Sequence, residues 1–167
     1  LYKGQNIYFD YSAIRLEGAR LMTMGGRASG PQPLIKLHDF IRETMHNAQG
    51  RQLTTLECHD ICNQIAEIVV VGGVRRSSQI SLSDLQDTDM RHAKEWPYPI
   101  KRAMANNSAI YREKPSAADF LKEWGSLALS GTGERGIFNL EAAQSKAPSR
   151  RYSPKIQGTN PCGEIML

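Results

Sequence analysis

Three residues near the end of the 167-residue sequence have side chains that could do chemistry together: Asn160, Cys162 and Glu164. A cysteine offers a reactive sulfur, an asparagine amide can orient a bound group, and a glutamate can accept a proton. They lie in a turn-rich stretch, and an extended backbone there would put all three on one side. A cysteine hydrolase would need a histidine, and none is close in the sequence. An ordinary structural turn is the alternative interpretation.

Two glycine-containing stretches, residues 25–31 and 72–78, are the next candidates, because they carry or adjoin arginines. Those arginines are Arg15, Arg27, Arg75 and Arg76. Backbone amides and guanidinium groups both bind phosphate oxygens, so each stretch could hold a nucleotide phosphate. Neither stretch has the GxGxxG pattern of dinucleotide sites or the GK[ST] of P-loops. Ordinary turns with solvated arginines are the alternative.

The remaining cysteines, Cys58 and Cys62, are four positions apart in a helical pattern and therefore share a face. We expect them to be small core or near-core residues. A zinc site would need two more ligands, and the histidines show no ligand pair, so we predict no metal site. The histidines, predicted to be partly exposed helix residues, are His38, His46, His59 and His92. An odd number of cysteines without a secretory segment indicates reduced thiols.

Composition excludes collagen-like, coiled-coil and disulfide-scaffold chains, since 40% of residues are hydrophobic and 23% are charged. No apolar run approaches the ~18–20 residues of a membrane span, so we predict a cytoplasmic protein with no membrane partner. The net charge of +4 suits a nucleotide-handling domain as well as a nucleic-acid-binding one. Leu1 begins a strand-like run and Leu167 ends an apolar one, and we expect an internal segment of a larger protein.

Hydrophobic periodicity and turn residues predict an alternation of strands and helices. The expected strands are 6–15, 79–83, 106–111 and 136–139, and the expected helices are 33–48, 55–70, 87–95 and one capped by Ser116. That last helix has an expected buried stripe of Phe120, Trp124 and Leu127. Residues 141–157 read as an exposed connector. The alternation predicts an α/β fold with mainly parallel strands.

The segment Asn160-Pro161-Cys162-Gly163-Glu164-Ile165 resembles the active-site segment of ribonucleotide reductases. Two further stretches fit that family in the same order: Ile14-Arg15 with residues 25–31, and residues 72–77. Residues 65–77 together with 105–109 are similar in particular to the monomeric, adenosylcobalamin-dependent class that reduces ribonucleoside triphosphates. The resemblance covers nearly the whole chain.

This resemblance implies roles for the three reactive residues. Cys162 would be the thiyl-radical residue that abstracts the ribose 3′-hydrogen. Glu164 would act as general base on the 3′-hydroxyl, and Asn160 would hydrogen-bond the sugar. The implied cofactor is adenosylcobalamin, and the implied reductant is thioredoxin.

The resemblance also implies that the two glycine-containing stretches are specificity loops for a deoxynucleotide effector. Arg15 would lie near the effector phosphates, and the second loop would link the effector to the substrate base. The candidate loop residues are Arg15, Gly25, Gly26, Ser29, Gly30, Gly72, Gly73, Arg75, Arg76 and Ser77. Solvent-facing arginines remain the alternative for Arg75 and Arg76. No direct binding of nucleic acid is expected.

The implied fold is part of the ten-stranded α/β barrel of these reductases, with residues 1–167 a partial barrel domain and Cys162 on a finger loop inside it. Cys58 and Cys62 match neither reducing cysteine of the family, and no cobalamin ligand can be named, so the chain alone is not expected to turn over. The alternatives are a dimeric or diphosphate-using reductase, or a non-enzymatic nucleotide-binding regulatory domain. Two helices between the loops favour the monomeric class, and a regulatory domain would leave Cys162 without a purpose.

Overall fold

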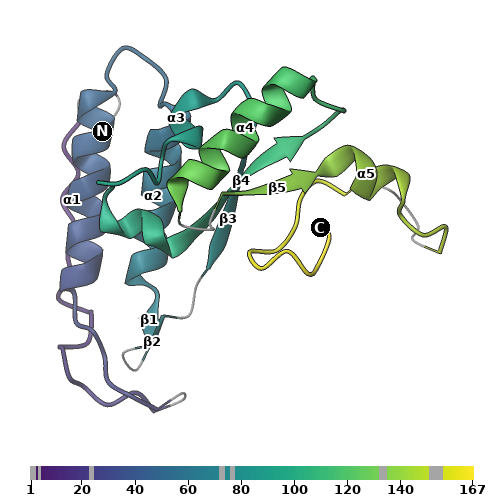
Figure 1. The fold of residues 1–167 in the computed structure, drawn as a ribbon. Helices are drawn as coiled ribbons and strands as arrows, with labels where there is room; N and C mark the ends of the chain where they lie inside the picture. Colours follow the sequence, from purple (N-terminus) through teal and green to yellow (C-terminus); the bar gives the residue numbers. More distant parts are fainter. Residues whose placement is uncertain are drawn as a thin grey trace. The chain divides into compact units, whose positions relative to one another are not determined.

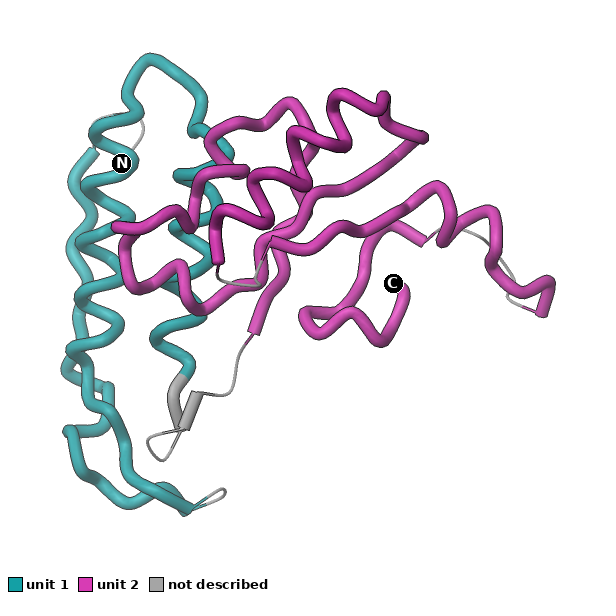
Figure 2. Tube along the Cα trace, in the orientation of Figure 1, with its two compact units in different colours: residues 1–77 teal, residues 78–167 magenta. Residues whose placement is uncertain are grey.

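A computed structural model gives the fold of residues 3, 5–22, 25–71, 74–75, 78–131, 135–150 and 156–167. The chain divides into two compact units, Leu1–Ser77 and Ser78–Leu167 (Figure 2). The first unit is mainly helical, and the second is built on a parallel sheet.

Two antiparallel helices form the first unit: α1 (Gln32–Asn47) and α2 (Thr55–Ile68) (Figure 1). Both confirm helices expected from the sequence, although α2 ends before residue 70. A short antiparallel pair follows, β1 (Val70–Val71) with β2 (Val74–Arg75). The buried residues of the two helices are Leu37, Thr44, His59, Asn63 and Ala66.

The start of α2 is held by a reciprocal cap. The Thr54 hydroxyl accepts from the Glu57 backbone N–H at 3.1 Å, and the Glu57 carboxylate accepts from the Thr54 N–H at 2.8 Å. Arg51 donates to both oxygens of Glu57, at 2.7 and 2.6 Å. These contacts, that from Arg51 foremost, lower the pKa of Glu57 to about 2, so the cap is charged near neutral pH.

Thr54→Ala is expected to lower the free energy of unfolding by about 1 kcal/mol, because one first-turn N–H loses its acceptor. Urea denaturation of the full-length protein measures this. Thr55→Ala is the matched control, since Thr55 is the first helical residue and provides no cap. An equal loss in both variants would contradict the assignment of Thr54 as the cap.

The predicted strand over 6–15 is wrong, because the described residues there form no strand. The side chains of Phe9 and Tyr11 contact α1 instead. The Phe9 ring stacks on His38 with centroids 3.9 Å apart, and the Tyr11 hydroxyl hydrogen-bonds the His38 Nδ1 at 2.8 Å. Among the described residues no strand lies beside this run to pair with it, and side-chain packing decides whether such a run becomes a strand.

Three parallel strands form the sheet of the second unit, in the order β3 (Gln79–Ser83), β4 (Ala105–Tyr111) and β5 (Arg135–Asn139). The elements between and after them are α3 (Thr88–Arg91), a 3₁₀ helix (Ile100–Met104), α4 (Ala117–Ser130) and α5 (Leu140–Ser145). The predicted α/β class and the three strands of this sheet are confirmed, whereas α3 is shorter than the expected helix over 87–95.

Alternate residues of β4 point to opposite faces of the sheet, which α4 and the C-terminal segment cover from opposite sides (Figure 1). On the face toward the C-terminal segment, Ile110 packs with Phe138, Leu140 and Ile156 in the hydrophobic core. The expectation of an exposed connector over 141–157 is therefore wrong at α5 and at Ile156, which is buried.

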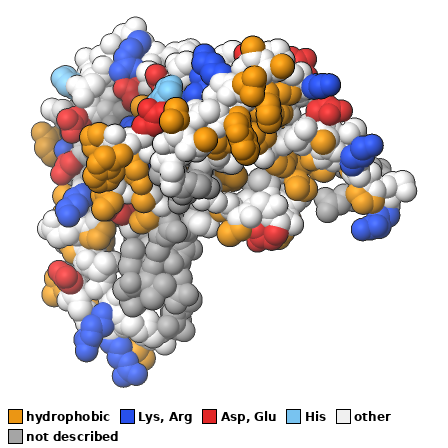
Figure 3. Space-filling view, viewed as in Figure 1, with side chains coloured by type: hydrophobic (Ala, Val, Ile, Leu, Met, Phe, Trp, Pro, Cys, Tyr) orange, Lys and Arg blue, Asp and Glu red, His pale blue; other side chains and the backbone are white. Residues whose placement is uncertain are grey.

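Helix α4 begins where the sequence predicts but is rotated from the expected orientation. Ser116 accepts from the Asp119 N–H at 3.1 Å, which confirms the cap. The predicted stripe is wrong: Phe120 is 41% and Trp124 57% exposed, while Glu123 is fully buried. Figure 3 shows the resulting apolar surface over α4.

Candidate functional site

The segment containing Cys162 folds back on itself as a hairpin. The Gly158 N–H donates to Leu167 O at 3.1 Å, the Leu167 N–H donates to Gly158 O at 2.9 Å, and Thr159 pairs with Met166. We call residues 157–167 the finger hairpin. It brings both ends of the segment together and leaves residues 161–164 at its tip.

The tip is a tight turn, in line with its turn-rich sequence, so the side chains do not alternate as they would on an extended backbone. The Asn160 N–H donates to Ile165 O at 3.0 Å, and the Gly163 N–H donates to Asn160 O at 2.9 Å. Gly163 has a φ of +82°, a left-handed conformation that side chains with a Cβ adopt at a cost. The three candidate residues therefore share one turn, but simple alternation along a strand does not describe their arrangement.

The Asn160 side chain helps to shape this turn. Its Oδ1 accepts from the Ile165 N–H at 2.8 Å and from the Thr159 hydroxyl at 3.4 Å. The carboxamide oxygen is thus committed to the hairpin, and among the described residues the Nδ2 group has no hydrogen-bond acceptor. Nδ2 remains a donor that can serve a bound molecule.

Cys162 and Glu164 are both exposed at the tip. Neither side chain makes a hydrogen bond or ion pair to the described part of the chain, so a thiol and a carboxylate on one short turn are open to a ligand.

The hairpin is fastened to the face of the sheet that carries Asn106 and Ile110. Asn106 on β4 donates from Nδ2 to the Pro161 carbonyl, and Met166 packs against the core cluster around Ile110. A Cβ added at Gly158 would lie 3.3 Å from the Leu82 Cδ1, so glycine allows the close approach of hairpin to β3.

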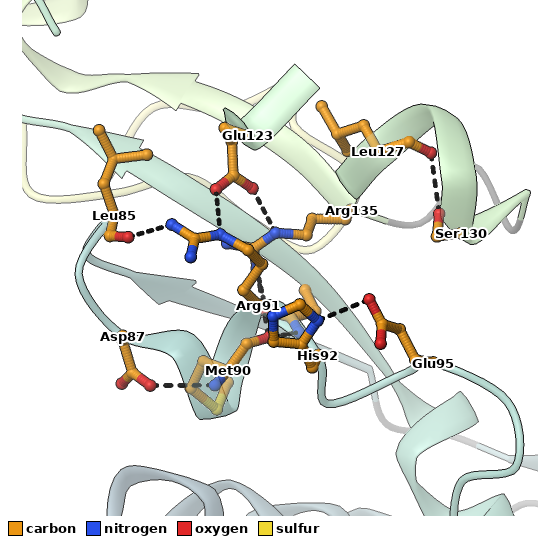
Figure 4. A network of polar contacts seen from close by, with 11 residues as sticks. Leu85, Asp87, Met90, Arg91, His92, Glu95, Glu123, Leu127, Ser130 and Arg135 are labelled. Atoms are coloured by element: carbon orange, nitrogen blue, oxygen red, sulfur yellow. Dashed lines mark hydrogen bonds and ion pairs between the residues drawn. The ribbon is translucent and has the colours of Figure 1, made fainter. Parts of the chain in front are cut away.

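On the opposite face of the sheet lies a buried charged network that the sequence analysis missed (Figure 4). Glu123 accepts from the Nε of Arg91 at 3.0 Å and from the Nε of Arg135, and all three residues are buried. The signal was present in the sequence: Glu123 lies three residues after Phe120 and four before Leu127, so a charged residue interrupts the predicted apolar stripe.

The network extends to the backbone of α3 and to a side chain of β4. Arg135 donates to the Met90 carbonyl at 3.2 Å and to Asn107 Oδ1 at 3.5 Å, while Asn107 Nδ2 donates to the same Met90 carbonyl at 2.7 Å. Asn107 adjoins Asn106 on β4. The charged network therefore fixes the strand that holds the hairpin.

Burial by itself would raise the pKa of Glu123, but the hydrogen bonds and charges of Arg135 and Arg91 outweigh it and hold the pKa below its usual value of 4.5. A lowered pKa contributes stability that is present above pH 4.5 and is lost as the pH falls toward the folded-state pKa.

We expect part of the acid destabilisation of the protein to disappear in Glu123→Gln, as measured by urea denaturation between pH 3 and pH 7. Identical pH slopes in the two proteins would contradict this.

The first glycine-containing stretch is a loop, as predicted. The Gly18 N–H donates to Ala28 O at 2.9 Å, and Arg27 donates to Gly18 O at 2.9 Å. Gly30 has a φ of +71°, and a Cβ there would meet the Glu17 backbone N at 3.1 Å. Arg15, Gly25, Gly26 and Ser29 are exposed.

The second stretch lies mostly outside the described residues. Gly72, Gly73, Arg76 and Ser77, and the side chain of Arg75, are among the positions that the structure does not describe. Their assignment to an effector loop stays a prediction.

Cys58 and Cys62 are exposed on α2, so the expectation of core positions is wrong. His59, expected to be partly exposed, is 4% exposed and packs in the helix pair. The helix is rotated so that His59, Asn63 and Ala66 face inward.

Within the described ranges, no three His, Cys, Asp or Glu side chains lie together as a metal site. Likewise, no described helix is long and apolar enough to cross a membrane.

Comparison with known proteins identifies the relatives of this chain. It is 35% identical over 169 residues to the adenosylcobalamin-dependent ribonucleoside-triphosphate reductase of Lacticaseibacillus paracasei, covering 96% of this chain and 22% of that protein. A reductase of the same name from Lactobacillus acidophilus is 36% identical over 171 residues, with 96% and 22% coverage. No protein-family model matches the chain.

The fold agrees with the sequence comparison. A crystal structure of a B12-dependent, class II ribonucleotide reductase matches with a TM-score of 0.74 and 30% identity, over 92% of this chain and 21% of that one. The chain thus spans about a fifth of the length of the relatives it matches. Over nearly its whole length, the chain is homologous to one segment of the adenosylcobalamin-dependent ribonucleoside-triphosphate reductases.

Proposed function

We propose that this chain is the part of an adenosylcobalamin-dependent ribonucleoside-triphosphate reductase that carries the radical cysteine. The observation that supports the proposal best is the finger hairpin: an exposed thiol and carboxylate on one turn, fastened to a parallel sheet, in a chain homologous to these enzymes. The whole protein would convert ribonucleoside triphosphates to 2′-deoxyribonucleoside triphosphates for DNA synthesis.

Cys162 would act as a thiyl radical, taking a hydrogen atom from ribose C3′ to form S–H and leave a carbon radical. Sulfur suits this step because its bond to hydrogen is weak enough to form and break reversibly. Glu164 would accept the 3′-hydroxyl proton while the 2′-hydroxyl leaves as water after protonation. A dithiol outside this segment would supply the two electrons, with thioredoxin as the final reductant.

Asn160 would have two functions. Its Oδ1 holds the turn through the Ile165 N–H, and its Nδ2 would donate to a sugar hydroxyl. One carboxamide would then couple the shape of the tip to the position of the ribose.

The cofactor would supply the radical when bound. Among the described residues we assign none to hold the corrin. What this chain contributes is the thiol at the tip, where a radical can be received, and the sheet that supports it.

Residues 25–31 and 72–79 would form the effector-specificity loops, with Arg15 near the effector phosphates. Positive-φ glycines such as Gly25 and Gly30 would let the first loop adapt to different deoxynucleotides. Residues 1–167 would form part of the ten-stranded barrel of a cytoplasmic, allosterically regulated enzyme.

The test is nucleotide reduction by the full-length protein with CTP or CDP and a dithiol, with and without adenosylcobalamin and with no second subunit. Reduction of CTP that requires adenosylcobalamin is the expected result. Preference for CDP, or activity only with a metal-containing partner subunit, would move the protein to another reductase class. Nucleotide binding without reduction under every condition would instead favour a regulatory domain.

A further inference from the structure

We infer that Asn106 is a positioning residue for the Cys162 sulfur, an assignment whose catalytic meaning rests on the proposed function. Asn106 lies on β4, 55 residues before its partner, and its carboxamide Nδ2 donates to the carbonyl of Pro161. The assignment of the amide group is chemically determined, because only the NH2 end of a carboxamide can donate to a carbonyl.

The contact matters because of where the Pro161 carbonyl lies in the chain. The Pro161 carbonyl belongs to the peptide group that joins Pro161 to Cys162, and a peptide group is planar. Holding that oxygen therefore fixes the plane immediately before the Cys162 Cα. With that plane held, only the rotations φ and χ1 of Cys162 remain to set the direction of the sulfur.

The other contacts of the hairpin do not act at this point. Backbone pairs between Gly158 and Leu167 close its base, and the Asn160 contacts shape its inside. Among the described residues, Asn106 is the side chain of the sheet that hydrogen-bonds the tip.

Asn106 is itself held on a rigid support. It pairs in register with Ile80 of β3, and the next residue along β4, Asn107, is tied to the Met90 carbonyl and to Arg135 on the other face of the sheet. Strand β4 thus links the buried Glu123 network on one face to the Cys162 tip on the other. A donor on such a support can hold a reacting atom in place.

The test uses the full-length protein with Asn106→Leu, which keeps approximate side-chain size and removes the donor. We expect kcat to fall by about 10- to 100-fold, because small misplacement of a reacting group has effects of that order. The KM for the nucleotide and the effector concentration for half-activation should stay unchanged. Amide hydrogen exchange of peptides covering residues 158–167 should become faster, and exchange elsewhere should not.

Ser108→Ala is the matched control, since Ser108 lies on the same face of β4 and makes no hydrogen bond to the finger hairpin among the described residues. It should leave hairpin exchange unchanged. Wild-type kcat and wild-type hairpin exchange in Asn106→Leu would overturn the assignment.

If Asn106→Leu loosens the whole protein, the Asn106→Gln variant decides, because it keeps the donor on a longer side chain. Partial recovery of kcat and of hairpin protection relative to Asn106→Leu supports the assignment. No recovery overturns it. A wild-type protein that fails to reduce nucleotides would contradict the proposed function. Because amide hydrogen exchange needs no turnover, the exchange data would still decide whether Asn106 holds the hairpin.

Discussion

Cys162→Ser is expected to lower the rate of nucleotide reduction by the full-length protein to background while leaving effector binding intact. The hydroxyl that replaces the thiol holds its hydrogen in a much stronger bond, so it cannot take part in reversible hydrogen-atom transfer with ribose C3′. The substitution changes one atom at an exposed tip and leaves the backbone contacts of the hairpin in place. Reduction of CTP and equilibrium binding of a deoxynucleotide effector are the two measurements.

Cys58→Ser and Cys62→Ser provide the matched controls, because both are exposed thiols in the helical unit and neither lies on the finger hairpin. They are expected to retain full activity. Substantial reduction by Cys162→Ser would argue against the radical role. Equal loss of effector binding and reduction would show that the two functions are not separate.

Glu123→Gln is expected to lower the free energy of unfolding by about 3–5 kcal/mol, because it leaves two buried guanidinium groups without a counter-charge. Arg91 and Arg135 are almost as buried as Glu123, with side-chain exposures of 4% and 5% against 0%. Neither guanidinium can escape to water without unpacking α3 from α4 and β5. Urea denaturation of the full-length protein at neutral pH measures the loss.

The exposed pair Asp84–Arg112 is the control for this prediction. Its side chains are 59% and 60% exposed at an N···O distance of 3.1 Å, so Asp84→Asn should cost less than about 1 kcal/mol. A similar cost for both variants would mean that the buried network is not what stabilises the second unit.

Local elements were predictable wherever neighbouring residues determine them. The Thr54–Glu57 capping box satisfies N–H groups within one turn, so its sequence signature predicted the start of α2. Helix α1 and the strands β3, β4 and β5 likewise lie where the sequence predicts them, within one or two residues. The resemblance carried by Asn160, Cys162 and Glu164 pointed to the family to which the comparisons connect the chain.

Periodicity failed where a partner distant in sequence decides the outcome. The aromatic run at 6–15 is not a strand, and the rings of Phe9 and Tyr11 contact His38 of α1 instead. Helix α4 turns Glu123 inward because Arg91 and Arg135 arrive from other elements. The spacing of apolar residues along a helix indicates which residues share a face, but the elements packed against the helix determine which face is buried.

The sequence by itself determined the candidate site residues, their order and the α/β alternation, since these depend on residue type and on spacing along the chain. Only the tertiary structure decided how the finger hairpin is held. Its tip turns through Gly163 instead of running extended, and it is attached to a sheet residue, Asn106, 55 positions earlier in the chain. A hydrogen bond between residues so far apart requires the strands to assemble first, and no local pattern around either residue contains that information.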